Sequence, residues 1–117
     1  MSIRPLFALM AISMLVGCAN DPAPTEQLRL TEQAIQQAQA VGAADDQPEL
    51  ARAQSKLTRA NADMVSKSFK DARMQAEQSE LDARLAEARV LSLKSEEQIN
   101  QLNTRLNRLR KQLGEAQ

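Results

Sequence analysis

Apolar residues recur at alternating intervals of three and four along most of the chain, the spacing of one face of an α-helix. A first helix is predicted over residues 26–41, because neither Pro nor Gly interrupts it and Gly42 is placed to end it. A second is predicted over 47–65, with Asp46 and Glu49 expected to cap its start reciprocally. The pattern therefore begins with two amphipathic helices joined by a short loop.

A third helix is predicted over residues 68–113. No Pro or Gly separates Glu49 from Leu113, so one continuous helix over 49–113 stays open as an alternative. Ser68 is a good N-cap residue, which favours a tight turn at 66–68. The interpretation with a turn gives three helices.

The third helix carries two apolar stripes. The first stripe consists of Phe69, Ala72, Ala76, Ser79, Ala83, Ala86, Val90 and Leu93. The second stripe consists of Leu81, Leu85, Ala88, Ser92, Ser95, Ile99, Leu102, Leu106, Leu109 and Leu113. Residues two apart lie about 200° apart around a helix axis, so the stripes face opposite ways. The first stripe is expected to pack on the two earlier helices, whereas the second finds no partner within the chain.

Beyond the first stripe, only the second one continues, in the 4–3 rhythm of a coiled coil. The expected coiled-coil interface consists of Ile99, Leu102, Leu106, Leu109 and Leu113. The predicted fold is all-α: a small up-down-up helical bundle, locally similar to a tetratricopeptide hairpin, with an elongated C-terminal coiled-coil helix. An alanine-rich bundle is expected over 26–93 and a coiled-coil extension over 94–117.

The N-terminal segment has the features of an export signal. An apolar run of eleven residues lies after Arg4. This run is shorter than the roughly 20 residues of a membrane-spanning helix. The run ends in Leu15-Val16-Gly17-Cys18, which resembles the lipobox of bacterial lipoproteins. This resemblance implies a signal peptide over 1–17, cleavage between Gly17 and Cys18, and acylation of the Cys18 thiol. Residues 18–25 then form the lipidated cysteine and a linker.

The same resemblance implies a location. In lipoproteins of bacteria with two membranes, Asp directly after the cysteine favours retention in the inner membrane, and this chain has Ala19 there. An outer-membrane, periplasm-facing anchor is therefore expected, with the inner membrane as the less favoured alternative. Two or three acyl chains make such an attachment effectively permanent.

Composition excludes several classes of chemistry. The chain has no His and one Cys, which argues against the common metal sites and against His-based catalytic triads. Its 15 basic and 15 acidic residues cancel, so no general attraction to nucleic acid is expected. The glutamates, including Glu49 and Glu80, are expected on solvated helix faces rather than as acid–base pairs. We predict no enzyme activity, catalytic residue, metal, cofactor, nucleic acid or small-molecule substrate.

A longer motif resembles a known family. It comprises Ala34, Ile35, Ala38, Gly42 and Ala43, followed by Pro48, Glu49, Leu50, Ala53, Lys56, Leu57 and Ala60. Together with the alanine-spaced helix that follows, this order is similar to an uncharacterised family of bacterial envelope lipoproteins, the domain of unknown function DUF4398. The resemblance covers about residues 24–90 and implies a helical module of the cell envelope.

Two classes of function agree with these patterns. The first is a lipid-anchored structural or protein-interaction module in the periplasm, whose coil binds a second copy or another envelope protein. The alternative is a chaperone-like or ligand-binding module that takes up amphipathic segments along the alanines of the first stripe.

Overall fold

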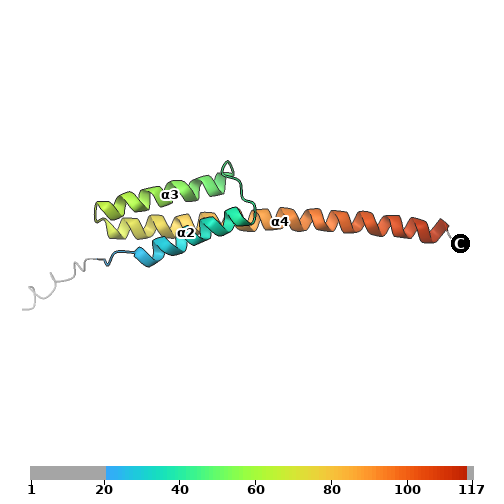
Figure 1. Ribbon diagram of the computed structural model, residues 1–117, viewed down its shortest axis with the longest axis horizontal. Coiled ribbons are helices and arrows are strands. Elements are labelled where there is room, and N and C mark those ends of the chain that lie inside the picture. Colours follow the sequence, from blue (N-terminus) through green and yellow to red (C-terminus); the bar gives the residue numbers. More distant parts are fainter. Residues whose placement is uncertain (1–20, 116–117) are drawn as a thin grey trace, which may run out of the picture.

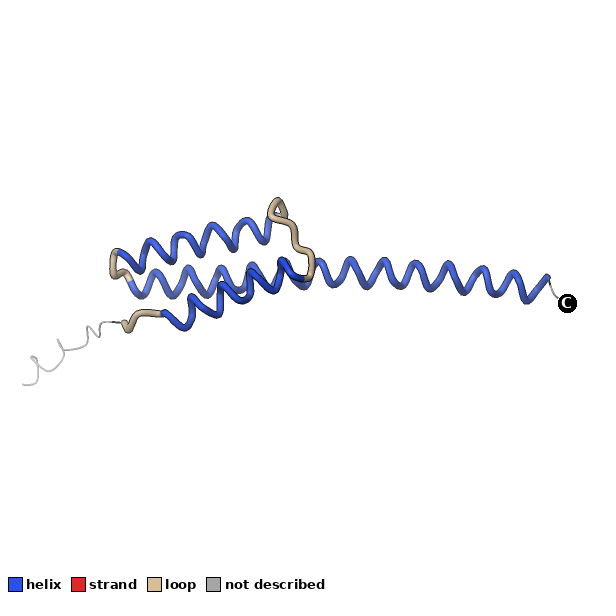
Figure 2. Tube along the Cα trace, viewed as in Figure 1, coloured by secondary structure: helices blue, strands red, loops and turns tan. Residues whose placement is uncertain are grey.

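The computed structural model describes residues 21–115, and these form three helices and no strand. Helix α2 spans Thr25–Ala40, α3 spans Pro48–Val65 and α4 spans Phe69–Glu115 (Figures 1 and 2). The all-α fold with a long C-terminal helix is thus confirmed, and the molecule is elongated. Gly17 and Cys18 lie outside the described residues.

The three helices run up, down and up, and α2 and α3 both pack on the first half of α4 (Figure 1). Two buried hydroxyls bridge the helices. Thr31 on α2 donates to the carbonyl of Ala76 on α4 at 2.9 Å, and Ser79 on α4 donates to the carbonyl of Ala53 on α3 at 2.6 Å. Because a buried hydroxyl without a partner is costly, these bonds fix how the helices align along one another.

Helix α2 ends as the sequence predicts. Gly42 adopts a φ of +105°, a backbone conformation that residues with a side chain rarely adopt. The N–H of Ala43 then donates back to the carbonyl of Ala38 at 2.9 Å, which closes a Schellman motif. The chain leaves α2 here and turns toward α3.

The turn between α3 and α4 settles the open alternative in favour of two helices. Lys67 has a φ of +61° where a glycine is usual, and the N–H of Ser68 donates to the carbonyl of Asp63 at 2.9 Å. Helix α4 begins immediately afterwards at Phe69. The predicted turn at 66–68 is therefore confirmed.

The predicted reciprocal cap between Asp46 and Glu49 is not formed at the start of α3, so this prediction is wrong. Gln47 is the N-cap and makes no side-chain capping bond, and Pro48 occupies the first helical turn. The carboxylate of Glu49 instead accepts from the guanidinium of Arg89 on α4, at 2.7 Å. A charged partner forms a stronger bond than a reciprocal cap to Asp46 offers, and only the folded bundle supplies that partner.

The interhelix contacts are built mainly from alanine. The fully buried alanines are Ala38, Ala53, Ala60, Ala72, Ala76, Ala83 and Ala86. Leu50 is the largest side chain with no exposed surface, and Leu28 and Ile35 are nearly as deeply buried. Small side chains allow the helix backbones to approach closely, and none of the buried core residues in the described part of the chain is aromatic.

The first stripe is buried from Ala72 to Ala86, but it ends sooner than the sequence suggests. Val90 still packs against the core, whereas Leu93 is 58% exposed. Helix α2 has ended by this level, and the last polar link to it runs from the Lys94 ammonium to the carbonyl of Val41 at 2.6 Å. The inclusion of Leu93 in the packed stripe is therefore wrong.

Candidate functional site

The second stripe lies along the face of α4 that α2 and α3 leave uncovered. Its seven large side chains are each 50–71% exposed, and its three small members are exposed as well. The large members are Leu81, Leu85, Ile99, Leu102, Leu106, Leu109 and Leu113. An apolar row of this length on one face is typical of a surface that binds another protein.

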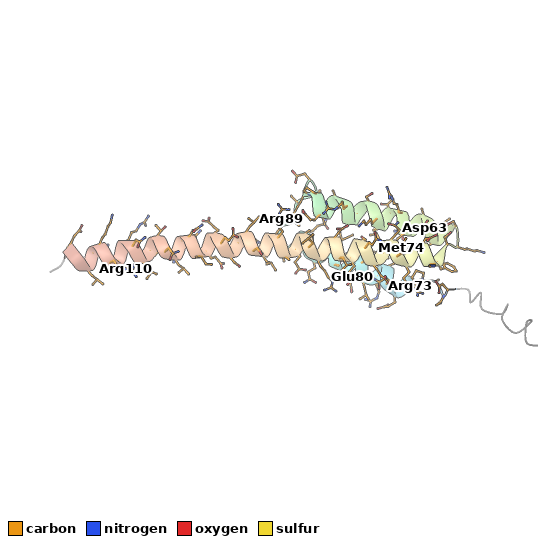
Figure 3. All side chains as sticks on the ribbon, turned by 180° about the vertical axis from the view of Figure 1, so that it is seen from behind. Asp63, Arg73, Met74, Glu80, Arg89 and Arg110 are labelled. Atoms are coloured by element: carbon orange, nitrogen blue, oxygen red, sulfur yellow. The ribbon has the colours of Figure 1, made fainter. Side chains whose placement is uncertain are left out.

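Neither α2 nor α3 lies beside the C-terminal part of α4. Every residue from 91 to 115 is exposed, and the stretch after Lys94 adds about 32 Å of helix at 1.5 Å per residue. Arg110 lies on this projecting part, whereas Arg89 lies beside the start of α3 (Figure 3). The structure thus brings the five predicted interface residues from Ile99 to Leu113 onto one face of a free-standing helix.

This exposure has an energetic consequence. Burying a leucine or isoleucine side chain is worth roughly 1.5–3 kcal/mol, so the five residues together forgo several kcal/mol while they remain in water. An isolated helical segment of this length is also marginally stable by itself. A partner along the second stripe would both bury the leucines and hold the segment helical.

Polar contacts border the second stripe where it passes the bundle. On the α2 side, Glu80 accepts from Arg84 at 2.6 Å and from Gln27 at 2.8 Å. The hydrogen bonds from Arg84 and then Gln27 lower the pKa of the Glu80 carboxyl below its ordinary value. On the α3 side, the Lys56 ammonium lies 2.7 Å from the Asp82 carboxylate. These charges are paired with one another beside the second stripe, and Leu81 and Leu85 between them are exposed.

A second polar cluster joins α3 to α4 at Glu49. This residue is only 7% exposed, so its expected place on a solvated face is wrong. Its own backbone N–H lowers the pKa of its carboxyl most strongly; burial opposes this, and the positive charges of Arg89 and Arg52 lower the pKa further. A carboxyl that stays ionised and is tied to Arg89 is an ionic link between helices, and it is unsuited to donating a proton near neutral pH.

Protonation of Glu49 is expected to weaken the fold. Because the folded-state pKa is lowered, the contribution is complete above the ordinary carboxyl value of 4.5 and is lost as the pH falls through the folded value. The free energy of unfolding should therefore drop more steeply below about pH 4.5 in the wild type than in Glu49→Gln, which lacks the titrating group. Urea unfolding at a series of pH values checks this, and parallel pH profiles of the two proteins would contradict it.

Other features offer little chemistry. A shallow groove beside the loop between α2 and α3 is lined by Gly42, Pro48, Val90 and Leu93. Within residues 21–115, no three side chains of the types His, Cys, Asp and Glu are grouped so as to hold a metal ion. None of the helices in that range has both the length and the apolar character needed to cross a membrane.

Comparison with known proteins decides the family. The model of a family described as a domain of unknown function, DUF4398, matches residues 26–102. The chain belongs to the DUF4398 family. A crystal structure of a DUF4398 protein from Pseudomonas aeruginosa PAO1 is 58% identical in sequence, with a TM-score of 0.78. The match covers 82% of this chain and 100% of the crystallised one. No curated protein matches the sequence.

The crystallised relative also has a practical consequence. The part of this chain that matches it, 82% of the residues, corresponds to the whole of the crystallised chain. The fragment 19–117 retains every described residue and lacks Cys18, the only cysteine. We expect this fragment to fold alone, which makes it suitable for measurements in solution.

Proposed function

We propose that this DUF4398 protein is a non-enzymatic, lipid-anchored module of the bacterial cell envelope that binds other proteins through the second stripe of α4. The observation that carries the proposal is the row of exposed apolar side chains from Ile99 to Leu113, on a part of α4 that neither α2 nor α3 covers. The partner is a second copy of the chain or another envelope protein. A lipid anchor would favour this function, because confinement to a membrane surface raises the effective concentration of partners.

The anchor is proposed at Cys18, on the outer membrane and facing the periplasm. The sequence Leu15-Val16-Gly17-Cys18 after an apolar run of eleven supports it, and the residues up to Pro24 supply a linker before α2. The helical bundle would thus be held near the membrane by its N-terminal end.

Replacing the proposed lipid attachment residue tests the anchor. The Cys18→Ser chain should accumulate as an uncleaved precursor that carries no lipid, because serine cannot form the thioether. Metabolic labelling with a palmitate analogue, together with the electrophoretic mobility of the chain, measures both effects. A variant that is still processed and still labelled would contradict the lipobox.

Crosslinking in intact cells tests the proposed binding function. A self-associating or specifically paired module should give one or two discrete crosslinked species, and Leu102→Asp with Leu106→Asp should remove them. Leu93→Asp is the matched control, because Leu93 is as exposed as these leucines but lies off the second stripe. A broad smear of adducts, or discrete species that survive the double substitution, would contradict the proposal.

The structure gives no support to the alternative in which the first stripe takes up client segments. Ala72, Ala76 and Ala83 of the first stripe have no exposed surface, because α2 and α3 pack against this side of α4. A client would have to displace a helix and break the buried hydroxyl bonds of Thr31 and Ser79. We therefore do not propose this function.

A further inference from the structure

The second stripe extends further than a contact between two C-terminal tails explains. Leu81 and Leu85 are 67% and 52% exposed, yet they lie beside the bundle, more than three helical turns before Ile99. A partner that covers only the C-terminal residues of the stripe would leave these two leucines exposed to water. The inference drawn from them rests on the proposed function and concerns the geometry of self-association.

The stripe has an uneven distribution of sizes. Large side chains stand at its N-terminal end and throughout its C-terminal half. Its centre is small, with Ala88, Ser92 and Ser95 in succession. In coiled-coil positions, Leu85, Ser92, Ile99, Leu106 and Leu113 are a residues, and Leu81, Ala88, Ser95, Leu102 and Leu109 are d residues.

A parallel, in-register dimer fits this distribution poorly. Each residue would face its own copy, so Ala88, Ser92 and Ser95 would form three adjacent layers without a large side chain. On the flanks, Arg105 at a g position would lie opposite Arg110 at the following e position, once on each side of the dimer. Underpacked layers and repeated like charges both weaken such an interface.

We infer that two copies of the chain pair antiparallel along the entire second stripe, about a two-fold axis level with Glu97. This register places Leu81 against Leu113 and Leu85 against Leu109 of the second copy. It also places Ala88 against Leu106, Ser92 against Leu102, and Ser95 against Ile99. Each pair combines an a with a d position, as antiparallel coiled coils require, and each small residue faces a large one.

The position of the two-fold axis follows from the need to cover both the N-terminal and the C-terminal leucines of the stripe. An antiparallel pairing of the tails alone, centred on Thr104, leaves Leu81 and Leu85 exposed and places Arg105 opposite its own copy. The pairing centred on Glu97 covers both leucines and separates the Arg105 side chains. Its one like-charge contact on the flanks is between the two Glu96 side chains at the axis.

The bundle leaves room for this partner. The tail of the second copy would lie on the face of α4 opposite α2 and α3, between the Glu80–Arg84 pair and the Asp82–Lys56 pair. The two bundles would sit at opposite ends of the assembly. The two Phe69 residues would lie about 84 Å apart along the axis, at 1.5 Å per residue. Both lipid anchors can then hold the dimer lengthwise along one membrane surface.

Distances between spin labels test the register. The fragment 19–117 contains no cysteine, so single cysteines at Glu97, Thr104 or Lys111 each carry one nitroxide. All three are exposed and lie on the side of α4 away from the second stripe. In the dimer centred on Glu97, the axial separation between the labels should be near zero at 97, about 21 Å at 104 and about 42 Å at 111. Double electron–electron resonance should thus give distances that increase along the series.

Other arrangements of the two chains would give different series of label distances. Equal distances at the three positions would show a parallel dimer, and a minimum at 104 would show pairing of the tails alone. Either result overturns the inferred register and leaves self-association intact. Absence of dipolar coupling at all three positions, with a monomeric mass, would overturn both the register and self-association through the stripe.

A substitution in the part of the second stripe beside the bundle tests the register independently. Leu85→Asp should weaken the dimer at least tenfold, because Leu85 lies in the inferred interface and is 52% exposed rather than part of the buried core. Leu93→Asp, on the same helix and similarly exposed, should leave the dimer constant unchanged. Circular dichroism confirms that both variants remain folded. Equal association of Leu85→Asp and the wild type would overturn the register.

Discussion

Leu102→Asp combined with Leu106→Asp is expected to convert fragment 19–117 into a monomer. The two substitutions remove two large apolar side chains from the middle of the C-terminal row and place carboxylates in the apolar interface. Each lost leucine burial costs roughly 1.5–3 kcal/mol, and an unpaired charge in an apolar interface adds to this. Because the melting temperature of an associating protein rises with concentration, that dependence should be present in the wild type and absent in the double variant.

The bundle itself should be unaffected by this change. Both leucines are at least half exposed and lie beyond the last contact of α4 with α2, so the helix content up to Lys94 should persist. Leu93→Asp again serves as the matched control and should keep the concentration dependence. A double variant that melts like the wild type at every concentration would argue against the second stripe as an interface.

Leu50→Ala should have the largest effect on the stability of the bundle. Leu50 is completely buried in a cluster whose other members are mostly alanine, including Ala34, Ala53 and Ala83. Alanines on rigid helices cannot move to fill a cavity, so the cost should lie in the range of about 2–5 kcal/mol. Denaturant unfolding of fragment 19–117 at a single low concentration measures it.

The comparison variant for this effect is Leu93→Ala. It removes the same atoms from a side chain that is 58% exposed, so a change within about 0.5 kcal/mol is expected. If the two alanine variants had equal stability, Leu50 would not be at the centre of the packing described above.

The helices themselves were predictable from local information. The expected ranges 26–41, 47–65 and 68–113 differ from the observed ones by at most two residues at any end. Helical periodicity set the elements, Gly42 marked one end, and the opposed faces of Ala83 and Leu81 separated the buried stripe from the exposed one. These features depend on residues close together in sequence.

The polar contacts between helices were not predictable in this way. Glu49 and Arg89 are 40 residues apart, and neither carries a local signal that identifies the other. The same is true of Thr31, whose hydroxyl bonds to a carbonyl of α4 45 residues away. The exposure of Leu93 depends on where α2 stops beside α4, which the periodicity of α4 alone cannot specify. Each of these features requires the tertiary arrangement.

Self-association through the second stripe of α4 is tested most directly by the mass of the protein in solution. Sedimentation equilibrium of fragment 19–117, from low to high micromolar concentration, should show a reversible transition from one chain to two. A mass of one chain throughout that range would contradict self-association through the second stripe.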